Sequence, residues 1–327
     1  MLTTPMDVLP MFPIRRSKKQ KQAFREAVTA YAEGQGYSVT EEKASFGARN
    51  LVIGNPETAK YLITAHYDTP AAMAIPNLLT PTNPVTFVLY QLVLLLYLLL
   101  PPLILSIGLT FAAFYAGALW LFTPEQMMLL DDWAAMIWYG IFLLLYFLNI
   151  GLVYFGPANK NNANDNTSGV VALLEIAKSM NPNLRDQVCF VLFDLEEKGL
   201  IGSASYRKKH KQASDRQLVL NLDCVGDGDE IRMFMTPKLK KDPVRYAPLY
   251  KCCGIFGGKR VQLRETGFGY NPSDYKQFPY GVGFVALKKS RFGLYLGKIH
   301  TKRDTNFDIT NINILRAAIL SMITAAQ

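Results

Sequence analysis

Two histidines and several carboxylates have the residue types that bind metal ions, and they follow apolar runs or lie in loops. His66 and Asp68 come directly after the apolar run 61–65, and Asp223 follows the run 218–222. Imidazole nitrogens and carboxylate oxygens are zinc ligands, and a catalytic zinc site leaves one position for water. We therefore expect a metal centre that activates water where these runs end.

A polar loop at 159–169 supplies the residue around which the others are expected to gather. Asp165 lies in this loop, just before an apolar run with helical spacing. Asn and Ser are favourable N-cap residues, so a helix is predicted to begin near Ser168. Taken alone this stretch fits a solvated turn, but the company of other metal-binding residues favours a functional site.

The remaining candidates are Glu196, Glu197 and His300. Two zinc ions about 3.5–4 Å apart need a bridging carboxylate, and Asp165 is the natural choice. Glu196 is then placed to accept a proton from the attacking water. Asp68 is expected to orient the imidazole of His66 from behind. The third histidine, His210, lies in a basic run and is expected on an exposed face away from the metal.

Composition narrows the class of partner. The 327 residues include 35 basic and 26 acidic side chains, which gives a net charge of +9. No nucleic-acid motif and no basic stripe with interleaved aromatic residues occurs, so no nucleic-acid partner is expected. The four cysteines form no CxxC pair, which favours reduced thiols in a cytosolic domain.

The elements that must position these residues follow an α/β pattern. Strands are predicted at 37–40, 50–54, 61–65, 187–193, 218–222, 284–287 and 293–297, and helices at 17–34, 167–180, 203–211 and 311–326. Strands that alternate with helices indicate an α/β sandwich. Ligands in open α/β sheets bind where the strands end, which is where the candidate residues lie.

The middle of the chain has a different character. The runs 85–122 and 133–155 are almost wholly apolar. A bilayer span needs about 20 apolar residues, so we predict an inserted transmembrane helical hairpin. The first span is expected to be kinked at Pro101-Pro102. A re-entrant segment before these prolines, with the true span after them, is the alternative.

This insertion divides the predicted catalytic domain into two parts, 1–80 and 158–327, with 81–157 between them. If the metal ligands before and after the insertion belong to one site, the number of bilayer crossings must be even. Every Lys and Arg lies outside the apolar runs and no signal-peptide pattern precedes them, so a cell-membrane protein with its catalytic domain in the cytoplasm is expected. Asn149 in the second span can hydrogen-bond another helix.

Five motifs in this order resemble those of the M28 zinc peptidases. They are His66-Tyr67-Asp68, Asn164-Asp165-Asn166-Thr167-Ser168-Gly169, Phe193-Asp194-Leu195-Glu196-Glu197 with the residues up to Ser203, Asn221-Leu222-Asp223, and His300-Thr301 with Asp304-Thr305. The resemblance covers most of the chain outside 70–157. It implies a three-layer α/β/α sandwich with a mixed, mostly parallel central sheet, and a centre of two Zn²⁺ ions.

The resemblance also implies a role for each residue. His66 and Asp223 would bind one zinc ion and Glu197 and His300 the other, with Asp165 between them. Glu196 matches the family's general base. Asp68 matches the family's aspartate that orients a metal ligand without binding the metal itself.

Two departures from the family pattern stand out. Ser273-Asp274 followed by Phe278 resembles a segment near the substrate pocket, but Tyr275 stands where a histidine is frequent. The larger departure is the apolar insertion, because typical soluble members have a short connection there.

Together these observations predict a membrane-anchored di-zinc aminopeptidase, with peptides that have a free N-terminus as substrates and the lipid bilayer as a partner. A single-zinc enzyme similar to glutaminyl cyclases and a non-catalytic membrane module of the same fold are the alternatives. The complete ligand set argues against both. The preferred N-terminal residue, the physiological substrate, the purpose of the hairpin and the oligomeric state are left open.

Overall fold

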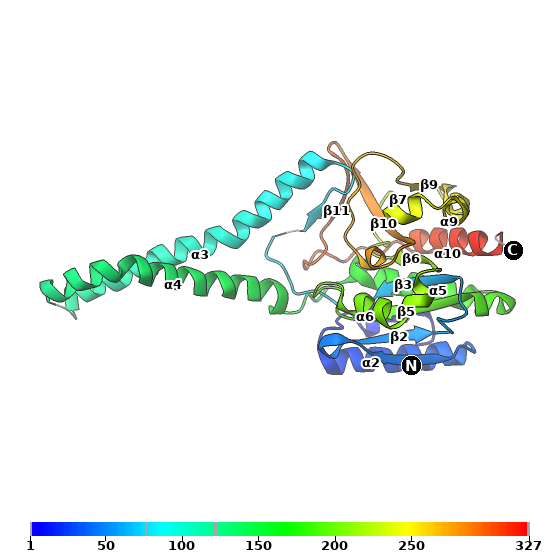
Figure 1. Ribbon diagram of the computed structural model, residues 1–327, viewed down its shortest axis with the longest axis horizontal. Coiled ribbons are helices and arrows are strands. Elements are labelled where there is room, and N and C mark those ends of the chain that lie inside the picture. The colour runs from blue at the N-terminus through cyan, green and yellow to red at the C-terminus, as the bar shows by residue number, and fades with distance from the viewer. Residues whose placement is uncertain (1, 76, 121–122, 326–327) are drawn as a thin grey trace. The chain divides into compact units, whose positions relative to one another are not determined.

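A mixed β-sheet with helices on both faces is the framework of one of two structural units (Figure 1). The computed structural model describes residues 2–75, 77–120 and 123–325. The unit that contains the sheet comprises Met1–Pro84 and Ala158–Gln327, and the other unit is Val85–Pro157.

Within the described residues, eleven strands join one sheet in the order β1-β2-β5-β3-β6-β10-β7-β9-β8, with β11 paired to β10 and β4. The strands are β1 (Val39–Lys43), β2 (Arg49–Ile53), β3 (Tyr61–His66), β4 (Leu78–Leu79), β5 (Val188–Phe193), β6 (Leu218–Leu222), β7 (Glu230–Met235), β8 (Gly254–Phe256), β9 (Lys259–Leu263), β10 (Gly281–Ser290) and β11 (Gly293–Gly297).

Parallel pairing is concentrated at the centre of this sheet. The neighbours β5, β3, β6 and β10 run parallel, and so do β7 and β9. The other six pairings among the described strands are antiparallel. The sheet is mixed, as predicted, but the expectation of a mostly parallel sheet is wrong. The connections β1–β2, β8–β9 and β10–β11 are hairpins, and such short connections can join only antiparallel strands.

Helices cover both faces of the sheet. Those of this unit are α1 (Val8–Met11), α2 (Lys18–Gly34), α5 (Gly169–Ser179), α6 (Ile201–Lys209), α7 (Lys211–Ser214), α8 (Pro237–Lys240), α9 (Pro243–Tyr246) and α10 (Ile309–Thr324). Ile63 of β3 lies in the core formed with α2, α5 and α10. Leu62, one residue earlier, lies in the opposite core with Tyr206 of α6. Successive strand residues point to opposite faces, so one apolar strand supplies both cores.

The second unit consists of two long helices, α3 (Pro84–Trp120) and α4 (Pro124–Phe155). In the described residues, Pro84–Ala116 and Trp133–Phe155 are long and apolar enough to cross a membrane. Only 11% and 0% of their most apolar windows are buried, which argues against core helices of a soluble protein. Leu121 and Phe122, at the end of the first predicted span, lie outside the described residues.

Helix α3 continues through Pro101 and Pro102, so the proline pair does not end it. Neither proline has an N–H group, which leaves the carbonyls four residues earlier without their helical donors. Those carbonyls belong to Tyr97 and Leu98. The side-chain amide of Asn149 in α4 donates to both of them, at 3.1 and 3.2 Å. One asparagine thus replaces the two donors that the proline pair removes.

We expect Asn149→Leu to destabilise the helix pair by about 1 kcal/mol, because two carbonyls lose their donor in an apolar environment. The loss should be much smaller in a Pro101→Leu/Pro102→Leu background, where backbone N–H groups take over. Unfolding of the full chain by SDS in detergent micelles measures this through tryptophan fluorescence. All three tryptophans, Trp120, Trp133 and Trp138, belong to this unit. An equal loss in both backgrounds would contradict the assigned role of Asn149.

Candidate metal centre

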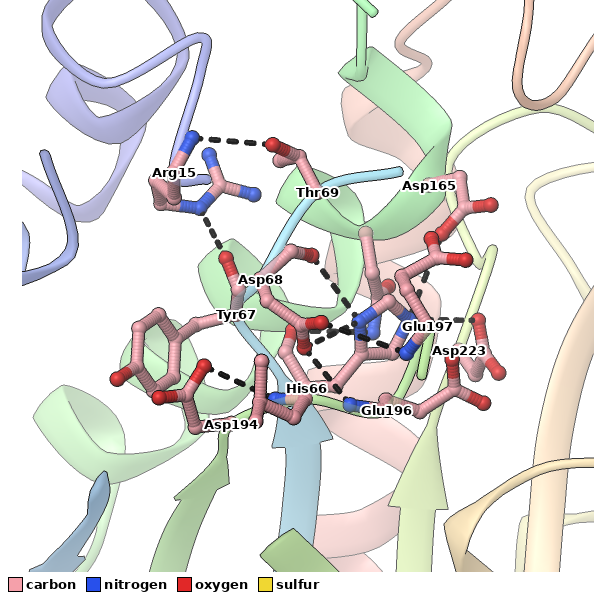
Figure 2. Close-up of polar contacts among 12 residues, drawn as sticks. Arg15, His66, Tyr67, Asp68, Thr69, Asp165, Asp194, Glu196, Glu197 and Asp223 are labelled. Carbon is pink, nitrogen blue, oxygen red and sulfur yellow. Dashed lines mark hydrogen bonds and ion pairs between the residues drawn. The ribbon is translucent and has the colours of Figure 1, made fainter. Parts of the chain in front are cut away.

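Three neighbouring strands bring the predicted residues to one edge of the sheet (Figure 2). β3 lies between β5 and β6 and is parallel to both. β3 ends at His66, Glu197 follows β5, and Asp223 follows β6. Asp165 comes from the segment before α5, and His300 from the loop after β11. The structure therefore brings all five predicted metal ligands together.

Each carboxylate oxygen of Asp165 faces a different pair of ligands. Its Oδ1 lies 3.4 Å from Nε2 of His66, and that nitrogen is 3.7 Å from Oδ1 of Asp223. Its Oδ2 lies 3.0 Å from Nε2 of His300, and that nitrogen is 3.3 Å from Oε2 of Glu197. Ligand atoms at the corners of a tetrahedron around zinc, with bonds of about 2.0–2.1 Å, are about 3.3 Å apart. The geometry fits two cation positions that share Asp165.

The electrostatics of the site also favour cations. Burial raises the pKa of Glu196 and of Glu197 well above the ordinary value, and neighbouring carboxylates add to the shift. Burial lowers the pKa of His66, but Glu196 and the other carboxylates outweigh this effect, so its pKa is raised. One oxygen of Glu197, Oε1, is buried without a hydrogen-bond partner. A divalent cation would offset this concentration of negative charge.

Asp68 holds the turn that carries two of the predicted residues. Its Oδ1 accepts a hydrogen bond from the backbone N–H of Glu196 at 3.0 Å, and its Oδ2 accepts one from Glu197 at 3.3 Å. Nδ1 of His66 lies 3.2 Å from the backbone oxygen of Asp68 and 3.6 Å from its Oδ1. The carboxylate therefore positions the turn through hydrogen bonds and lies beyond hydrogen-bond distance of the imidazole.

Side chains of the asparagine-rich loop and of Asp304 fix the position of Asp165. The two oxygens of Asp304 accept the backbone N–H groups of Asn164 and Asp165, both at 2.9 Å. Asn166 donates to the backbone oxygen of Leu222 at 3.0 Å. A Cβ atom at Gly169 would lie 2.2 Å from that same oxygen, so only glycine fits there. The motif thus ties the bridging loop to the end of β6.

Arg15 is a further part of this support that the sequence did not single out. Its side chain is fully buried. Its Nε donates to the backbone oxygen of Tyr67 at 2.5 Å (Figure 2). Its Nη1 donates to Oγ1 of Thr167 at 3.1 Å. It therefore joins the segments that carry the first histidine and the bridging aspartate. In the sequence it belongs to a basic run that is typical of an exposed surface, so no pattern distinguishes it.

The predicted pocket segment lies beside the site. Ser273 donates to Oδ2 of Asp223 at 2.5 Å. Asp274 is buried, and burial raises its pKa to about 7. Tyr275, which stands where a histidine is frequent in the family, is buried. It packs so closely on β10 that a Cβ atom at Gly283 would lie 2.5 Å from its ring.

His210 lies away from the metal centre, but its predicted exposure is wrong. The residue is only 9% exposed. Its Nδ1 lies 2.8 Å from Glu57 and its Nε2 lies 3.0 Å from Glu42. The neighbouring Lys209 also contacts Glu42, at 2.7 Å. Glu42 and Glu57 thus cover the imidazole of His210, although its neighbours in the sequence are basic and typical of an exposed surface.

Several solved structures share this fold. The LapA aminopeptidase of Legionella pneumophila aligns with a TM-score of 0.56 and 13% identity, over 98% of this chain and 68% of its own. A Zn-dependent exopeptidase from Parabacteroides distasonis aligns at 0.54 and 15%, over 96% and 92%. A glutaminyl cyclase from Porphyromonas gingivalis aligns at 0.54 and 17%, again over 96% and 92%. At these identities the likeness concerns the fold alone.

The sequence itself decides the family. No curated protein matches it. The profile of Peptidase family M28 matches residues 152–323, which is more than half of the chain. This stretch begins within α4 and ends within α10, and it contains every predicted metal ligand except His66. The chain therefore belongs to peptidase family M28.

Proposed function

We propose that this protein is a membrane-anchored, zinc-dependent aminopeptidase that removes N-terminal residues from peptides. The observation that carries the proposal is the carboxylate of Asp165, with one oxygen toward His66 and Asp223 and the other toward His300 and Glu197. Two zinc ions held by these residues would supply Lewis acidity and a water molecule activated for attack.

The side chains around this centre have complementary tasks. Glu196 accepts the proton of the attacking water and passes it to the leaving amine. Asp68 keeps Glu196 in place through its backbone N–H. Ser273 restrains Asp223 from the outer side. The carboxylates that surround the site favour a substrate with a positively charged α-amino group, which supports exopeptidase cleavage.

The proposed membrane anchor rests on the second unit. An even number of crossings leaves both parts of the sheet-containing unit on one side of the bilayer. The described residues include two helices that are long and apolar enough for this. Because the Lys and Arg residues lie outside these helices, the proposal places the catalytic unit in the cytoplasm.

A glutaminyl cyclase is the second candidate, because solved enzymes of that kind share the fold. It would bind one zinc ion and form a ring from an N-terminal glutamine without adding water. The second imidazole, His66, lies with Asp165 and Asp223 and favours the two-zinc proposal.

Zinc content and product identity separate the two candidates. The detergent-purified chain is assayed for zinc by mass spectrometry and incubated with a panel of aminoacyl amides and with a peptide that begins with glutamine. We expect about two zinc ions per chain and release of free amino acids, both lost after chelation. About one zinc ion with loss of ammonia from the glutamine peptide would favour the cyclase. No zinc after metal is added back would refute the ligand assignment.

A further inference from the structure

The segment 288–303 is strongly basic. It contains six Lys or Arg residues and no Asp or Glu. It comprises the last residues of β10, a tight turn, all of β11 and the start of the following loop, which carries the metal ligand His300. All of it belongs to the sheet-containing unit. An excess of positive charge on one continuous stretch attracts an anionic partner.

Most of this charge is not compensated by carboxylates. Lys288 lies 2.8 Å from Asp227, and Lys289 lies 3.2 Å from Glu230. Among the residues that the structure describes, the other four basic side chains of the segment form no ion pair. These exposed residues are Arg291, Lys298, Lys302 and Arg303. Their charge is therefore available to a partner outside the chain.

Two hydrogen bonds hold this segment beside the ends of the proposed membrane hairpin. The side-chain amide of Asn83 donates to the backbone oxygen of Phe292 at 2.8 Å, and α3 begins at the next residue, Pro84. The side-chain amide of Asn161 donates to the backbone oxygen of Lys302 at 2.6 Å, six residues after α4 ends. The segment is thus fastened close to the points where the chain would enter and leave the bilayer.

The length of α3 indicates the depth of the first attachment point. Its apolar part, Pro84–Ala116, has 33 residues and extends about 50 Å at 1.5 Å per residue. The hydrocarbon core of a bilayer is about 30 Å thick, and about 40–45 Å thick with the headgroup regions. A spanning helix of this length places its first turn outside the hydrocarbon. The turn held by Asn83 would therefore lie among the lipid headgroups.

The two apolar helices have no basic residue of their own at this level. No Lys or Arg occurs between Lys60 and Lys160. Membrane spans are commonly flanked on the cytoplasmic side by Lys and Arg, which are attracted to anionic lipids. The segment 288–303 supplies such residues in space, although it comes much later in the chain.

The turn between β10 and β11 has the composition of an interfacial contact. Ser290 orders it, because its hydroxyl donates to the backbone oxygen of Gly293 at 2.8 Å and accepts the N–H of Phe292 at 3.1 Å. Phe292 is 55% exposed, and the guanidinium of Arg291 lies 4.6 Å from the centre of its ring. An exposed aromatic ring beside a cation suits the boundary between acyl chains and headgroups.

We propose that the segment 288–303 binds the headgroups of anionic phospholipids in the bilayer that holds α3 and α4. The inference rests on the proposed membrane anchor. It adds a lipid preference that the apolar helices alone do not define. Because His300 belongs to the same segment, this contact would hold the metal centre beside the bilayer surface.

Native mass spectrometry of the detergent-purified full chain measures the preference, with phosphatidylglycerol and phosphatidylcholine titrated separately. Each Lys or Arg near an anionic surface strengthens binding by about fivefold, so we expect the wild type to bind phosphatidylglycerol at least about thirtyfold more tightly. The preference should fall by about tenfold to thirtyfold in Arg291→Gln/Lys302→Gln, and by about fivefold in Arg291→Gln alone. Lys240→Gln/Lys241→Gln removes two charges from an exposed surface just after β7 and should keep the wild-type preference.

Hydrogen exchange of the full chain in nanodiscs locates the contact. The amides of residues 289–293 should exchange more slowly in phosphatidylcholine mixed with phosphatidylglycerol than in phosphatidylcholine alone. The amides of 237–246, in α8 and α9, should exchange alike in both. Equal exchange of 289–293 in the two kinds of nanodisc would contradict a contact with anionic headgroups.

The possible failures are distinguishable. If alkaline carbonate extracts the chain from membranes, the proposed membrane anchor itself is wrong. If the chain stays in the membrane but binds both lipids alike, or if Arg291→Gln/Lys302→Gln keeps the preference, the lipid inference is overturned. It is also overturned if the preference falls only in variants that have lost zinc. The same holds if the double variant keeps its lipid preference but cleaves acidic peptides less well in detergent, because the segment would then contact the substrate.

Discussion

Glu196→Gln is expected to lower kcat/KM by about 10²- to 10⁴-fold and to leave the zinc content unchanged, because an amide cannot accept the proton of the attacking water. The effect should lie mainly in kcat. The backbone N–H of Glu196 is held by Asp68 at 3.0 Å whatever the side chain, so the substitution should not move the turn. Turnover on the best aminoacyl amide and zinc per chain are the two measurements.

Substitutions at the neighbours Glu196 and Glu197 should affect zinc binding differently. An oxygen of Glu196 lies within 4.8 Å of ligand atoms of both His66 and Asp223, so geometry alone permits Glu196 to bind a metal ion. If it does, Glu196→Gln will lose zinc. Glu197→Gln, one position later, should lose zinc because that carboxylate contacts His300 at 3.3 Å. Glu33→Gln at the end of α2 serves as the neutral control. Normal turnover in Glu196→Gln would remove this residue from the mechanism.

The site residues that could be predicted from the sequence are those that directly follow apolar strands. His66 and Asp223 follow short apolar runs, and parallel neighbours bring such positions to one edge. The supporting residues have no comparable signal. Arg15 is buried between two loops although it belongs to a basic run, and His210 is covered by acidic residues 153 and 168 positions earlier in the chain. Burial that depends on distant partners cannot be read from local composition.

The same limit explains the errors in the sheet. Strand β7 was not predicted, because Glu230 and Arg232 interrupt its apolar pattern. In the structure these two side chains pair with each other at 2.5 Å, and Arg232 also donates to Gln262 of β9 at 2.7 Å. A partner on the same strand and one on the neighbouring strand thus compensate for charged residues that argue against a strand. Three of the six antiparallel pairings, β7–β10, β4–β11 and β8–β9, involve strands that were not predicted, and the other three join predicted strands.

Asp165→Asn is expected to remove zinc from the whole centre, because the two proposed zinc ions share this one carboxylate. An amide has a single oxygen to offer and no charge, whereas Asp165 faces His66 with one oxygen and His300 with the other. We expect less than about one zinc ion per chain and a loss of at least about 10²-fold in kcat/KM, since a bound zinc ion contributes several kcal/mol of transition-state stabilisation.

Loss of metal must be separated from loss of fold in this variant. The backbone N–H of Asp165 still reaches Asp304, so the loop keeps its main anchor. Thermal unfolding in the presence of a chelator compares the variant with the metal-free wild type and should show both to be folded. Asp186→Asn, at an exposed position just before β5, makes the same chemical change and should retain all zinc. A folded Asp165→Asn variant with its full zinc content would mean that Asp165 does not bridge the ions, and the pairing of His66 with Asp223 and of His300 with Glu197 would then need two separate sites.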